Sequence, residues 1–284
     1  MNTHIVYVNG EFLPAKEASV SIYDRGFLMA DSVYEVSAVV KGKLIDNSAH
    51  LKRLERSLGE LNMPMPWSFS ELSNIQRQII EKNHITNGEI YLQVTRGTGV
   101  RDFLIDTNMR PTLIMFPIFH DPLAAQNEPG LKIQTLPDIR WQRRDIKTTQ
   151  LLAQSLCRSI AHHNGYDDAW MVDEHGYITE GTANNAYIVK GDSVFTRPAN
   201  HEILNGITRQ AMIKIINQLG LRLVEKAFTP REAILANEAF ITSAANWATP
   251  VLSIDNHIIG DGKAGKVTLA LRDNYLSALE ELSE

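Results

Sequence analysis

The sequence predicts an α+β protein of two domains, and three features of the 284-residue chain indicate this. Strand patterns precede helix patterns in the first half, whereas the two kinds of pattern mix in the second half. A polar segment with two prolines and a glycine separates the halves, so we expect a small N-terminal domain over 1–120, a linker over 121–130 and a larger C-terminal domain over 131–284. A chain of this length can bury a substantial core, and a cleft between the domains is the expected place for a ligand.

The N-terminal half begins with a hairpin pattern, because Asn9-Gly10 lies between two short apolar runs. Val33–Val40 is rich in β-branched residues and predicts a strand. Leucines three and four residues apart predict a helix that begins near Ser48, and a second apolar stripe predicts a helix over 69–83. The last elements expected in this half are strands over 89–96 and 112–119, which flank a loop over 97–110.

In the C-terminal half, short apolar runs predict strands and amphipathic periods predict helices. The expected strands cover 131–135, 169–173, 186–189, 193–196 and 239–242, and the expected helices cover 148–164, 206–219 and 266–282. The sequence contains no internal repeat, heptad run or low-complexity segment.

Composition and charge exclude several classes of protein. The net charge of -5 is mild and charges of both signs are interleaved, which is not typical of a nucleic-acid-binding face or a membrane-binding patch. No window has the run of about 18 apolar residues that a membrane span needs, and no signal peptide is recognisable, so we expect a cytoplasmic protein. The single cysteine, Cys157, permits no intrachain disulfide and no four-cysteine metal site, and we expect it to be a buried apolar residue. We expect no metal cofactor.

Lys147 ends the most unusual stretch of the chain. Four basic residues and one acid lie within the eight residues from Arg140 to Lys147, directly before an expected apolar helix. Cations close to a lysine favour its neutral amine, which can attack carbonyl groups. The same pattern also fits a solvated basic run at the start of a helix, and charge alone favours that interpretation.

Three further segments could each bind part of a small ligand. Between two expected strands lies Glu180, whose carboxylate could face a heterocyclic nitrogen. Gly206 opens an expected helix, so the free N–H groups of that helix and the hydroxyl of Thr208 could bind an anion. The small residues of Thr242–Ala245 follow an expected strand. Each segment also fits an ordinary connection, helix cap or strand end.

Together these segments supply the parts that pyridoxal 5'-phosphate (PLP) requires: an amine for a Schiff base, a carboxylate for the pyridine nitrogen and a helix start for the phosphate. Motifs of other enzyme classes are missing from the sequence, namely the nucleophile elbow, the H-E-x-x-H helix, the P-loop and the dinucleotide-binding glycine motif. His162 and His163 are adjacent on an expected helix and therefore point apart, so we expect them at the surface.

A series of short motifs then runs in order through nearly the whole chain. They are Asp24-Arg25-Gly26, Val33-Tyr34-Glu35-Val36, His50-Leu51-Lys52-Arg53-Leu54, Tyr91-Leu92-Gln93-Val94-Thr95-Arg96-Gly97, Asp138-Ile139-Arg140-Trp141, Asp145-Ile146-Lys147, Thr179-Glu180-Gly181, Gly206-Ile207-Thr208-Arg209 and Asp261-Gly262-Lys263. With these motifs the sequence resembles the fold-type IV PLP-dependent aminotransferases (class IV), and among them the D-amino acid (D-alanine) aminotransferases.

The resemblance implies a fold-type IV homodimer with the active site in the interdomain cleft. It implies that Lys147 is the Schiff-base lysine and the proton shuttle of the reaction, and that Glu180 binds the pyridine nitrogen. It further implies that Arg53 and residues at the expected helix start and strand end hold the phosphate. The other cofactor-binding residues that it implies are Arg53, Asn185, Ile207, Thr208, Ser243 and Ala244.

The resemblance is weakest in the residues expected to bind the substrate. Tyr34 and Val36 fit the substrate-binding strand of the D-amino acid enzymes, and Arg101 fits a loop arginine that reaches over from the partner subunit. Phe103 stands where that family has a histidine, and the neighbouring Asp102 would partly neutralise the arginine. Losing one donor of a charged contact costs on the order of 1–3 kcal/mol, which weakens carboxylate binding without abolishing it.

The resemblance therefore predicts a ping-pong aminotransferase that moves the amino group of a D-amino acid, such as D-alanine or D-glutamate, to a 2-oxoacid. The alternatives are an (R)-selective amine transaminase, then a branched-chain L-amino acid aminotransferase or an aminodeoxychorismate lyase. A PLP-binding scaffold without turnover is disfavoured, because the lysine, glutamate and arginine expected for the cofactor are all present.

Overall fold

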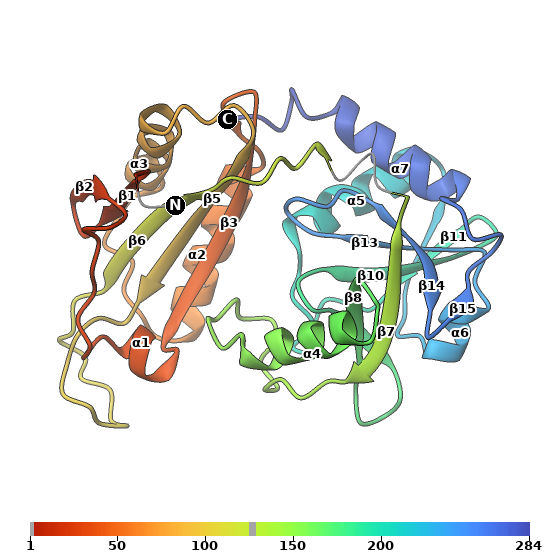
Figure 1. The fold of residues 1–284 in the computed structure, drawn as a ribbon, viewed down its shortest axis with the longest axis horizontal. Coiled ribbons are helices and arrows are strands. Elements are labelled where there is room, and N and C mark those ends of the chain that lie inside the picture. Colours follow the sequence, from red (N-terminus) through yellow and green to blue (C-terminus); the bar gives the residue numbers. More distant parts are fainter. Residues whose placement is uncertain (1–2, 125–128) are drawn as a thin grey trace. The chain divides into compact units, whose positions relative to one another are not determined.

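Two units, each with its own sheet and core, make up the chain (Figure 1). This computed structural model describes residues 3–124 and 129–284. The first unit comprises Met1–Leu123, Ile146–Gln150 and Leu282–Glu284, and the second comprises Ala124–Asp145 and Leu151–Glu281. Helices and strands occur in both units, which confirms the predicted α+β class. Part of the expected linker, residues 125–128, lies outside the described residues.

The first unit is built on a six-stranded antiparallel sheet in the order β2-β1-β6-β5-β3-β4. Its strands are β1 (Ile5–Val8), β2 (Glu11–Pro14), β3 (Ser32–Val40), β4 (Lys43–Leu44), β5 (Gly88–Thr95) and β6 (Thr112–Ile118). The hairpin between β1 and β2 turns at Asn9-Gly10, where both residues have positive φ, as the sequence predicted. Helices α2 (Asn47–Glu60) and α3 (Phe69–Lys82) pack on this sheet, and the short helix α1 (Arg25–Met29) precedes β3.

Local sequence explains where these helices begin and which face they bury. A capping box at Ser68 and Glu71 starts α3, since the side chain of each residue accepts a hydrogen bond from the backbone N–H of the other. Leu51, Leu54 and Leu58 are at most 1% exposed, so the predicted leucine stripe of α2 does face the core. Helix α1 was not predicted from the sequence, because its five residues are too few to show a period.

The segment Ile146–Gln150 pairs with β3 and does not begin a helix. Tyr34 donates its backbone N–H to the carbonyl of Lys147 at 3.0 Å, and Thr149 donates to the carbonyl of Ser32 at 3.1 Å. The helix expected from Thr148 therefore begins only at Leu152. The same pairing groups this segment with the first unit, although the sequence suggested that it belongs to the C-terminal domain.

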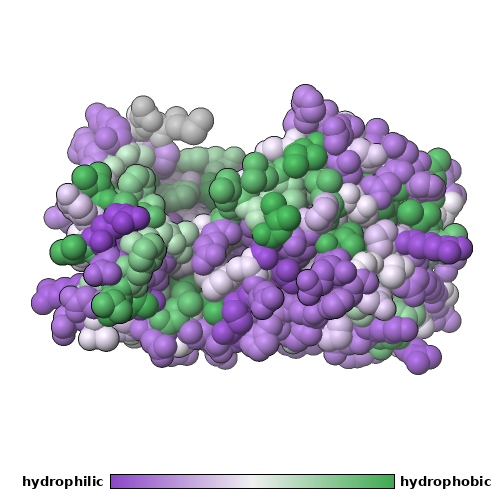
Figure 2. Space-filling model, turned by 90° about the horizontal axis from the view of Figure 1, so that it is seen from below, coloured by the Kyte–Doolittle hydropathy of each residue, from purple (hydrophilic) through white to green (hydrophobic). Residues whose placement is uncertain are grey.

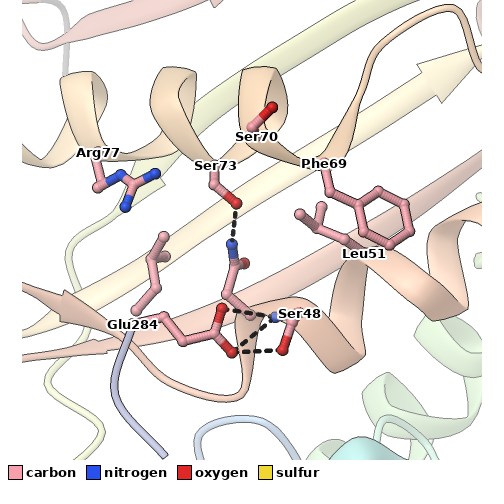
Figure 3. Close-up of a pocket in the computed structure, with 9 residues that line it drawn as sticks. Ser48, Leu51, Phe69, Ser70, Ser73, Arg77 and Glu284 are labelled. Atoms are coloured by element: carbon pink, nitrogen blue, oxygen red, sulfur yellow. Dashed lines mark hydrogen bonds between the residues drawn. The ribbon is translucent and has the colours of Figure 1, made fainter.

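Residues 282–284 also pair with the first unit. Glu284 exchanges backbone hydrogen bonds with Leu44, and its carboxylate accepts from the backbone N–H and hydroxyl of Ser48 in the first turn of α2 (Figure 3). The C-terminal helix expected over 266–282 is shorter than predicted, since α7 ends at Ser277. A carboxylate at a helix N-terminus is stabilising, so Glu284 supplies the cap that Asp46 does not provide by its side chain.

A pocket of about 220 Å³ lies between α2, α3 and Glu284 (Figure 3). Several of its polar side chains bond to neighbours within the unit; Asn47, for example, donates to Ser73 and Gln76. None of the residues expected to act on a substrate or to hold a cofactor lines this pocket.

The second unit is built on a nine-stranded sheet of mixed direction. Its path is β12-β11-β10-β13-β14-β7-β8-β9, with β15 paired to β14. The strands are β7 (Leu131–Pro137), β8 (Asp168–Val172), β9 (Ile178–Gly181), β10 (Asn185–Lys190), β11 (Ser193–Thr196), β12 (Arg222–Glu225), β13 (Glu238–Thr242), β14 (Thr249–Ile254) and β15 (His257–Ile258). The helices are α4 (Leu152–His163), α5 (Ile207–Gln218), α6 (Pro230–Ile234) and α7 (Lys266–Ser277).

Strand β9 corrects the expectation that residues 179–185 form a simple connection. Its four residues are all buried and mixed in polarity, so they show neither the alternation nor the apolar run that predicts a strand. The short strands β12 and β15 and the one-turn helix α6 were missed for a related reason, since each carries too few residues to show a period.

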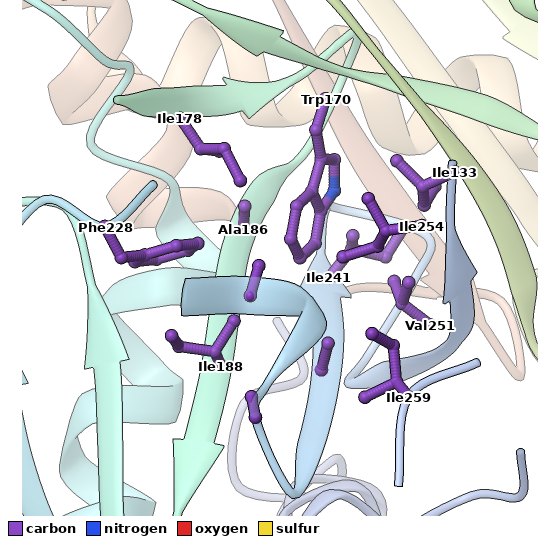
Figure 4. Close-up of a cluster of buried hydrophobic side chains, with 13 residues drawn as sticks. Ile133, Trp170, Ile178, Ala186, Ile188, Phe228, Ile241, Val251, Ile254 and Ile259 are labelled. Carbon is purple, nitrogen blue, oxygen red and sulfur yellow. The ribbon is translucent and has the colours of Figure 1, made fainter. Parts of the chain in front are cut away.

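The core of the second unit is an aliphatic cluster around Trp170 (Figure 4). Trp170 contacts the ring of Phe228 edge to face, with ring centroids 6.2 Å apart. A separate small cluster buries Cys157 of α4 against β8, as the sequence predicted, and burial raises the pKa of its thiol. His162 and His163 are exposed, also as predicted. Among the described residues, no helix is both long and apolar enough to cross a membrane.

Candidate active site

Lys147 and Tyr34, 113 positions apart in the sequence, lie together in the first unit. The Nζ atom of Lys147 lies 4.2 Å from the centroid of the Tyr34 ring. Tyr34 in turn stacks on Tyr91 of β5, with ring centroids 5.4 Å apart. Val36, the next residue on the same face of β3, pairs with Tyr91 across the sheet. An amine therefore lies above an aromatic surface, next to two of the residues expected to contact the substrate.

The arginines that precede Lys147 are not a cluster of unpaired cations. Arg140 pairs with Asp138 and Glu180, and Arg143 pairs with both oxygens of Asp145 at 3.0 Å. Arg144 lies 3.3 Å from Asp138. Carboxylates thus neutralise these charges within the second unit. These ion pairs do not support the interpretation that neighbouring cations activate Lys147, which the charge pattern alone did not favour either.

Glu180 is buried at the end of β9, where three donors hold its carboxylate. Arg140 Nη1 donates to Oε1 at 2.5 Å, Asn185 Nδ2 donates to Oε2 at 3.1 Å, and the backbone N–H of Leu204 is shared between both oxygens. Burial raises the pKa of Glu180, and the Arg140 charge opposes that rise. A carboxylate offers about four acceptor positions, and these three donors fill them because the Leu204 N–H is divided between the two oxygens at 3.3 and 3.2 Å. This divided bond is the longest of the three contacts, so it is the one that a further donor, such as a protonated pyridine nitrogen, would displace.

Asp138 and Thr179 hold Arg140 in place. Arg140 donates to both oxygens of Asp138, and the hydroxyl of Thr179 donates to Asp138 Oδ2 at 2.7 Å. Burial acts to raise the pKa of Asp138, but the bonds from Arg140 outweigh it and the pKa is lowered. An ionised Asp138 keeps Arg140 oriented toward Glu180.

The start of α5 has the features of an anion-binding site. Gly206 caps the helix without a side chain, so the first-turn N–H groups of Ile207 and Thr208 have no side-chain cap. A Cβ atom at Gly206 would lie 2.3 Å from Asn185 Oδ1, so a larger residue here would displace the Asn185 side chain. The hydroxyl of Thr208 donates to the carbonyl of Ser243 at 2.8 Å, which joins the helix start to the turn after β13.

That turn is closed by its own hydrogen bonds. Ser243 and Asn246 bond to each other through backbone and side-chain atoms, and the carbonyl of Ala244 accepts from the indole of Trp247 at 2.9 Å. Glu180 with Asn185, and Thr208 with Ser243, are therefore the expected cofactor residues that the second unit brings into contact. Their arrangement fits a pyridine ring that carries a phosphate.

Arg53 lies in the first unit and pairs with a buried glutamate that the sequence did not single out. Arg53 donates from Nε and Nη2 to the two oxygens of Glu35, each at 2.7 Å, and His50 Nδ1 lies 2.7 Å from Glu35 Oε2. Burial acts to raise the pKa of Glu35, but the Arg53 charge and the hydrogen bonds lower it to about 2. This pairing orients the guanidinium expected to hold the phosphate.

One signal in the sequence could have identified Glu35. It is the one charged residue of a largely buried strand, on the opposite face from Tyr34 and Val36, and a buried charge requires a partner. His50 and Arg53, three residues apart on α2, were the available partners.

The loop between β5 and β6 exposes most of its side chains. Arg101 is exposed and its guanidinium lies 5.9 Å from the Phe103 ring, which is itself 83% exposed. The carboxylate of Asp102 accepts from the backbone N–H of Leu104 at 3.1 Å. Among the described residues Arg101 makes no ion pair, so the expectation that Asp102 neutralises it is not supported.

Comparisons with known proteins agree with the resemblance in the sequence. Residues 32–254 match the family described as amino-transferase class IV. The D-alanine aminotransferase of Staphylococcus haemolyticus is 34% identical over 280 residues, which cover 98% of this chain and 99% of that protein.

Solved structures share the fold over nearly the full chain. The branched-chain amino acid aminotransferase of Escherichia coli has a TM-score of 0.91 and 25% identity, covering 99% of this chain and 96% of that one. The branched-chain amino acid aminotransferase of Thermobaculum terrenum, solved in its PLP form, has a TM-score of 0.85 and 23% identity, covering 99% of this chain and 95% of that one. The expected fold type IV is thereby confirmed.

Proposed function

Because the chain belongs to the class IV aminotransferase family and is a PLP-dependent transaminase, we propose that it moves the amino group of a D-amino acid to a 2-oxoacid. The observation that carries this proposal is the contact between Lys147 Nζ and Tyr34, which joins the expected cofactor lysine to the expected substrate strand. The similarity to a D-alanine aminotransferase over nearly the whole chain supports the D stereochemistry.

In this proposal Lys147 is the Schiff-base lysine and Glu180 binds the pyridine nitrogen. The phosphate is held by Arg53 and by the N–H groups at Ile207 and Thr208, and Ser243 and Ala244 lie near it. Asn185 lies beside the ring. The three donors that hold Glu180 and the pairing of Arg53 with Glu35 support these roles, because each charged group is already oriented before a cofactor binds.

PLP, when bound, supplies an electron sink for the electron pair released as the substrate Cα–H bond breaks. Lys147 Nζ accepts the Cα proton as general base and afterwards donates it as general acid. Glu180, oriented by Arg140 and Asn185, would hold the proton of the ring nitrogen in place. Tyr34 lies under the amine and limits its positions.

We propose that Tyr34, Val36 and Arg101 contact the substrate, with Arg101 facing its carboxylate. Phe103 offers no hydrogen-bond donor, so the dependence on a carboxylate should be weaker than with a histidine at this position. This substitution favours the second candidate function, turnover of (R)-amines without a carboxylate.

We further propose a homodimer in the cytoplasm. Val100, Phe103 and Leu104 on the loop are each at least 80% exposed, and Ile22 and Phe27 next to the loop base are at least 68% exposed. Figure 2 shows hydrophobic side chains on the surface of the first unit. Large apolar groups that gather on a surface are typical of an interface, and a second copy is the partner that the family resemblance implies.

The proposal is tested by a spectrophotometric half-reaction screen with D-alanine, D-glutamate, their L enantiomers and both enantiomers of 1-phenylethylamine. We expect the D-amino acids to convert the absorbance of bound PLP to that of the pyridoxamine form, and (R)-1-phenylethylamine to do so more slowly. Conversion by L-amino acids alone would contradict the proposed stereochemistry. Pyruvate released from aminodeoxychorismate without an amino acceptor would indicate the lyase.

A further inference from the structure

Arg25 connects the start of β3 to the loop that carries Arg101. Its side chain is buried; Nε donates to Asp31 Oδ2 at 2.7 Å, and Nη1 donates to the backbone carbonyl of Asp102 at 2.6 Å. Asp31 directly precedes β3, and Asp102 lies between Arg101 and Phe103. One guanidinium therefore bonds both to the entrance of the substrate strand and to the middle of the loop.

The base of the loop is fixed independently of the Arg25 side chain, although the backbone N–H of Arg25 donates to the carbonyl of Gly97 at 2.9 Å. Asp24 and Thr98 form a β-bridge, and Gly97 adopts a positive φ at which a Cβ atom would lie 1.9 Å from the carbonyl of Arg110. In the part of the chain that the structure describes, the hydrogen bond from Arg25 is the only one that joins residues 100–105 to another element. Within one chain, this bond is therefore the hydrogen bond that fixes the position of the stretch relative to the base.

We propose that Arg25 is a positioning residue that fixes the loop over 100–105 and so determines how tightly Arg101 binds the substrate carboxylate. This inference rests on the proposed function, in which Arg101 faces the carboxylate. A loop held in place presents its arginine without a further ordering cost, whereas a released loop loses conformational entropy at each binding event. Substrate binding should therefore weaken when Arg25 is replaced, while the chemical step at Lys147 should not change.

Arg96 provides a matched control, because it bonds to the same carboxylate. Its Nε also donates to Asp31 Oδ2 at 2.7 Å, and it is as buried as Arg25. Its remaining donors bond to the carbonyls of Leu61 and Asn62, which follow α2. Arg96→Met removes a buried ion pair with Asp31 but leaves the bond from Arg25 to the loop.

The experiment measures kcat and KM for D-alanine with saturating 2-oxoglutarate in Arg25→Met, Arg96→Met, Arg101→Ala and the Arg25→Met/Arg101→Ala double variant. In Arg25→Met we expect KM to rise about tenfold, as for the loss of one charged contact, with kcat within about twofold of the unsubstituted enzyme. Arg96→Met should keep KM near its original value. Adding Arg25→Met to Arg101→Ala should raise KM no further, because Arg25 acts through Arg101.

Three results would overturn the inference: an unchanged KM in Arg25→Met, an equal rise in Arg96→Met, or a full additional rise in the double variant. If Arg25→Met does not fold, Arg25→Lys decides the question, since it keeps a cation beside Asp31 but lacks the two divergent donors. An unchanged KM in Arg101→Ala would show that the proposed carboxylate role of Arg101 fails, and the role of Arg25 with it. If KM rises in Arg101→Ala but not in the Arg25 variants, the role of Arg25 is contradicted while the role of Arg101 stands.

Discussion

Replacing Lys147 by alanine is expected to lower kcat by about 10²–10⁴-fold, which is the range that a positioned general acid–base contributes. The variant should also lose the absorbance band of the lysine-bound cofactor. The fold should persist, because Lys147 takes part in strand pairing through its backbone carbonyl and its side chain is only half-buried. Steady-state turnover of D-alanine, the visible spectrum and thermal unfolding measure these three effects.

Lys52→Ala is the matched control for this substitution. Lys52 is an exposed lysine on α2, one residue from Arg53, so its loss removes a positive charge without touching the groups around Tyr34. We expect its turnover and spectrum to match those of the unsubstituted enzyme. If Lys147→Ala retains turnover close to that of Lys52→Ala, Lys147 is not the proton shuttle.

Replacing Glu35 by glutamine is expected to lower the free energy of unfolding by about 3 kcal/mol near neutral pH, because the charge of Arg53 is left beside a neutral amide. The pKa of Glu35 is about 2 in the folded chain, below its ordinary value of 4.5. The stability due to its ionised form is therefore fully present above about pH 4.5 and is lost as the pH falls toward 2. Urea unfolding is measured from about pH 7 to the acid limit of folding. The difference in the free energy of unfolding between the unsubstituted protein and Glu35→Gln should shrink below pH 4.5.

Glu60→Gln is the control for the pH dependence. Glu60 pairs with Arg56 one helical turn away at 3.7 Å on the exposed face of α2, where such a pair contributes at most about 0.5 kcal/mol. Glu35→Gln and Glu60→Gln remove the same charge, but only the first removes a buried one. Equal stabilities of the two variants, or a Glu35→Gln effect that stays constant down to about pH 3, would show that the buried pair does not stabilise the fold.

Elements with a clear period were predictable from the sequence. The leucine stripe of α2 follows from helical spacing and the Asn9-Gly10 hairpin from turn chemistry. Both depend on neighbouring residues alone, and the structure confirms both. Strand β9 and helix α1 could not be predicted in this way, because four or five residues of mixed polarity show no period. Thr148 was placed in a helix because the apolar residues that follow it have helical spacing, yet its pairing with Val33 excludes a helix there.

In the candidate site, likewise, some features could be predicted from the sequence and others could not. The candidate residues Lys147, Glu180 and the glycine before α5 could be proposed from their type and their motifs. Their partners were not evident. Arg140 was noted as one cation of the basic run before Lys147, but it pairs with Glu180. Glu35 was quoted only as part of a motif, although it orients Arg53.

The sequence by itself determined the family and the cofactor, because short motifs in order along the chain carry the resemblance to the class IV aminotransferases, and it suggested the residue types of the candidate site. Only the tertiary structure decided which charge neutralises which, and which strand Lys147 lies beside. Those contacts join positions 18 to 113 residues apart, and long-range pairing leaves no period in a single sequence.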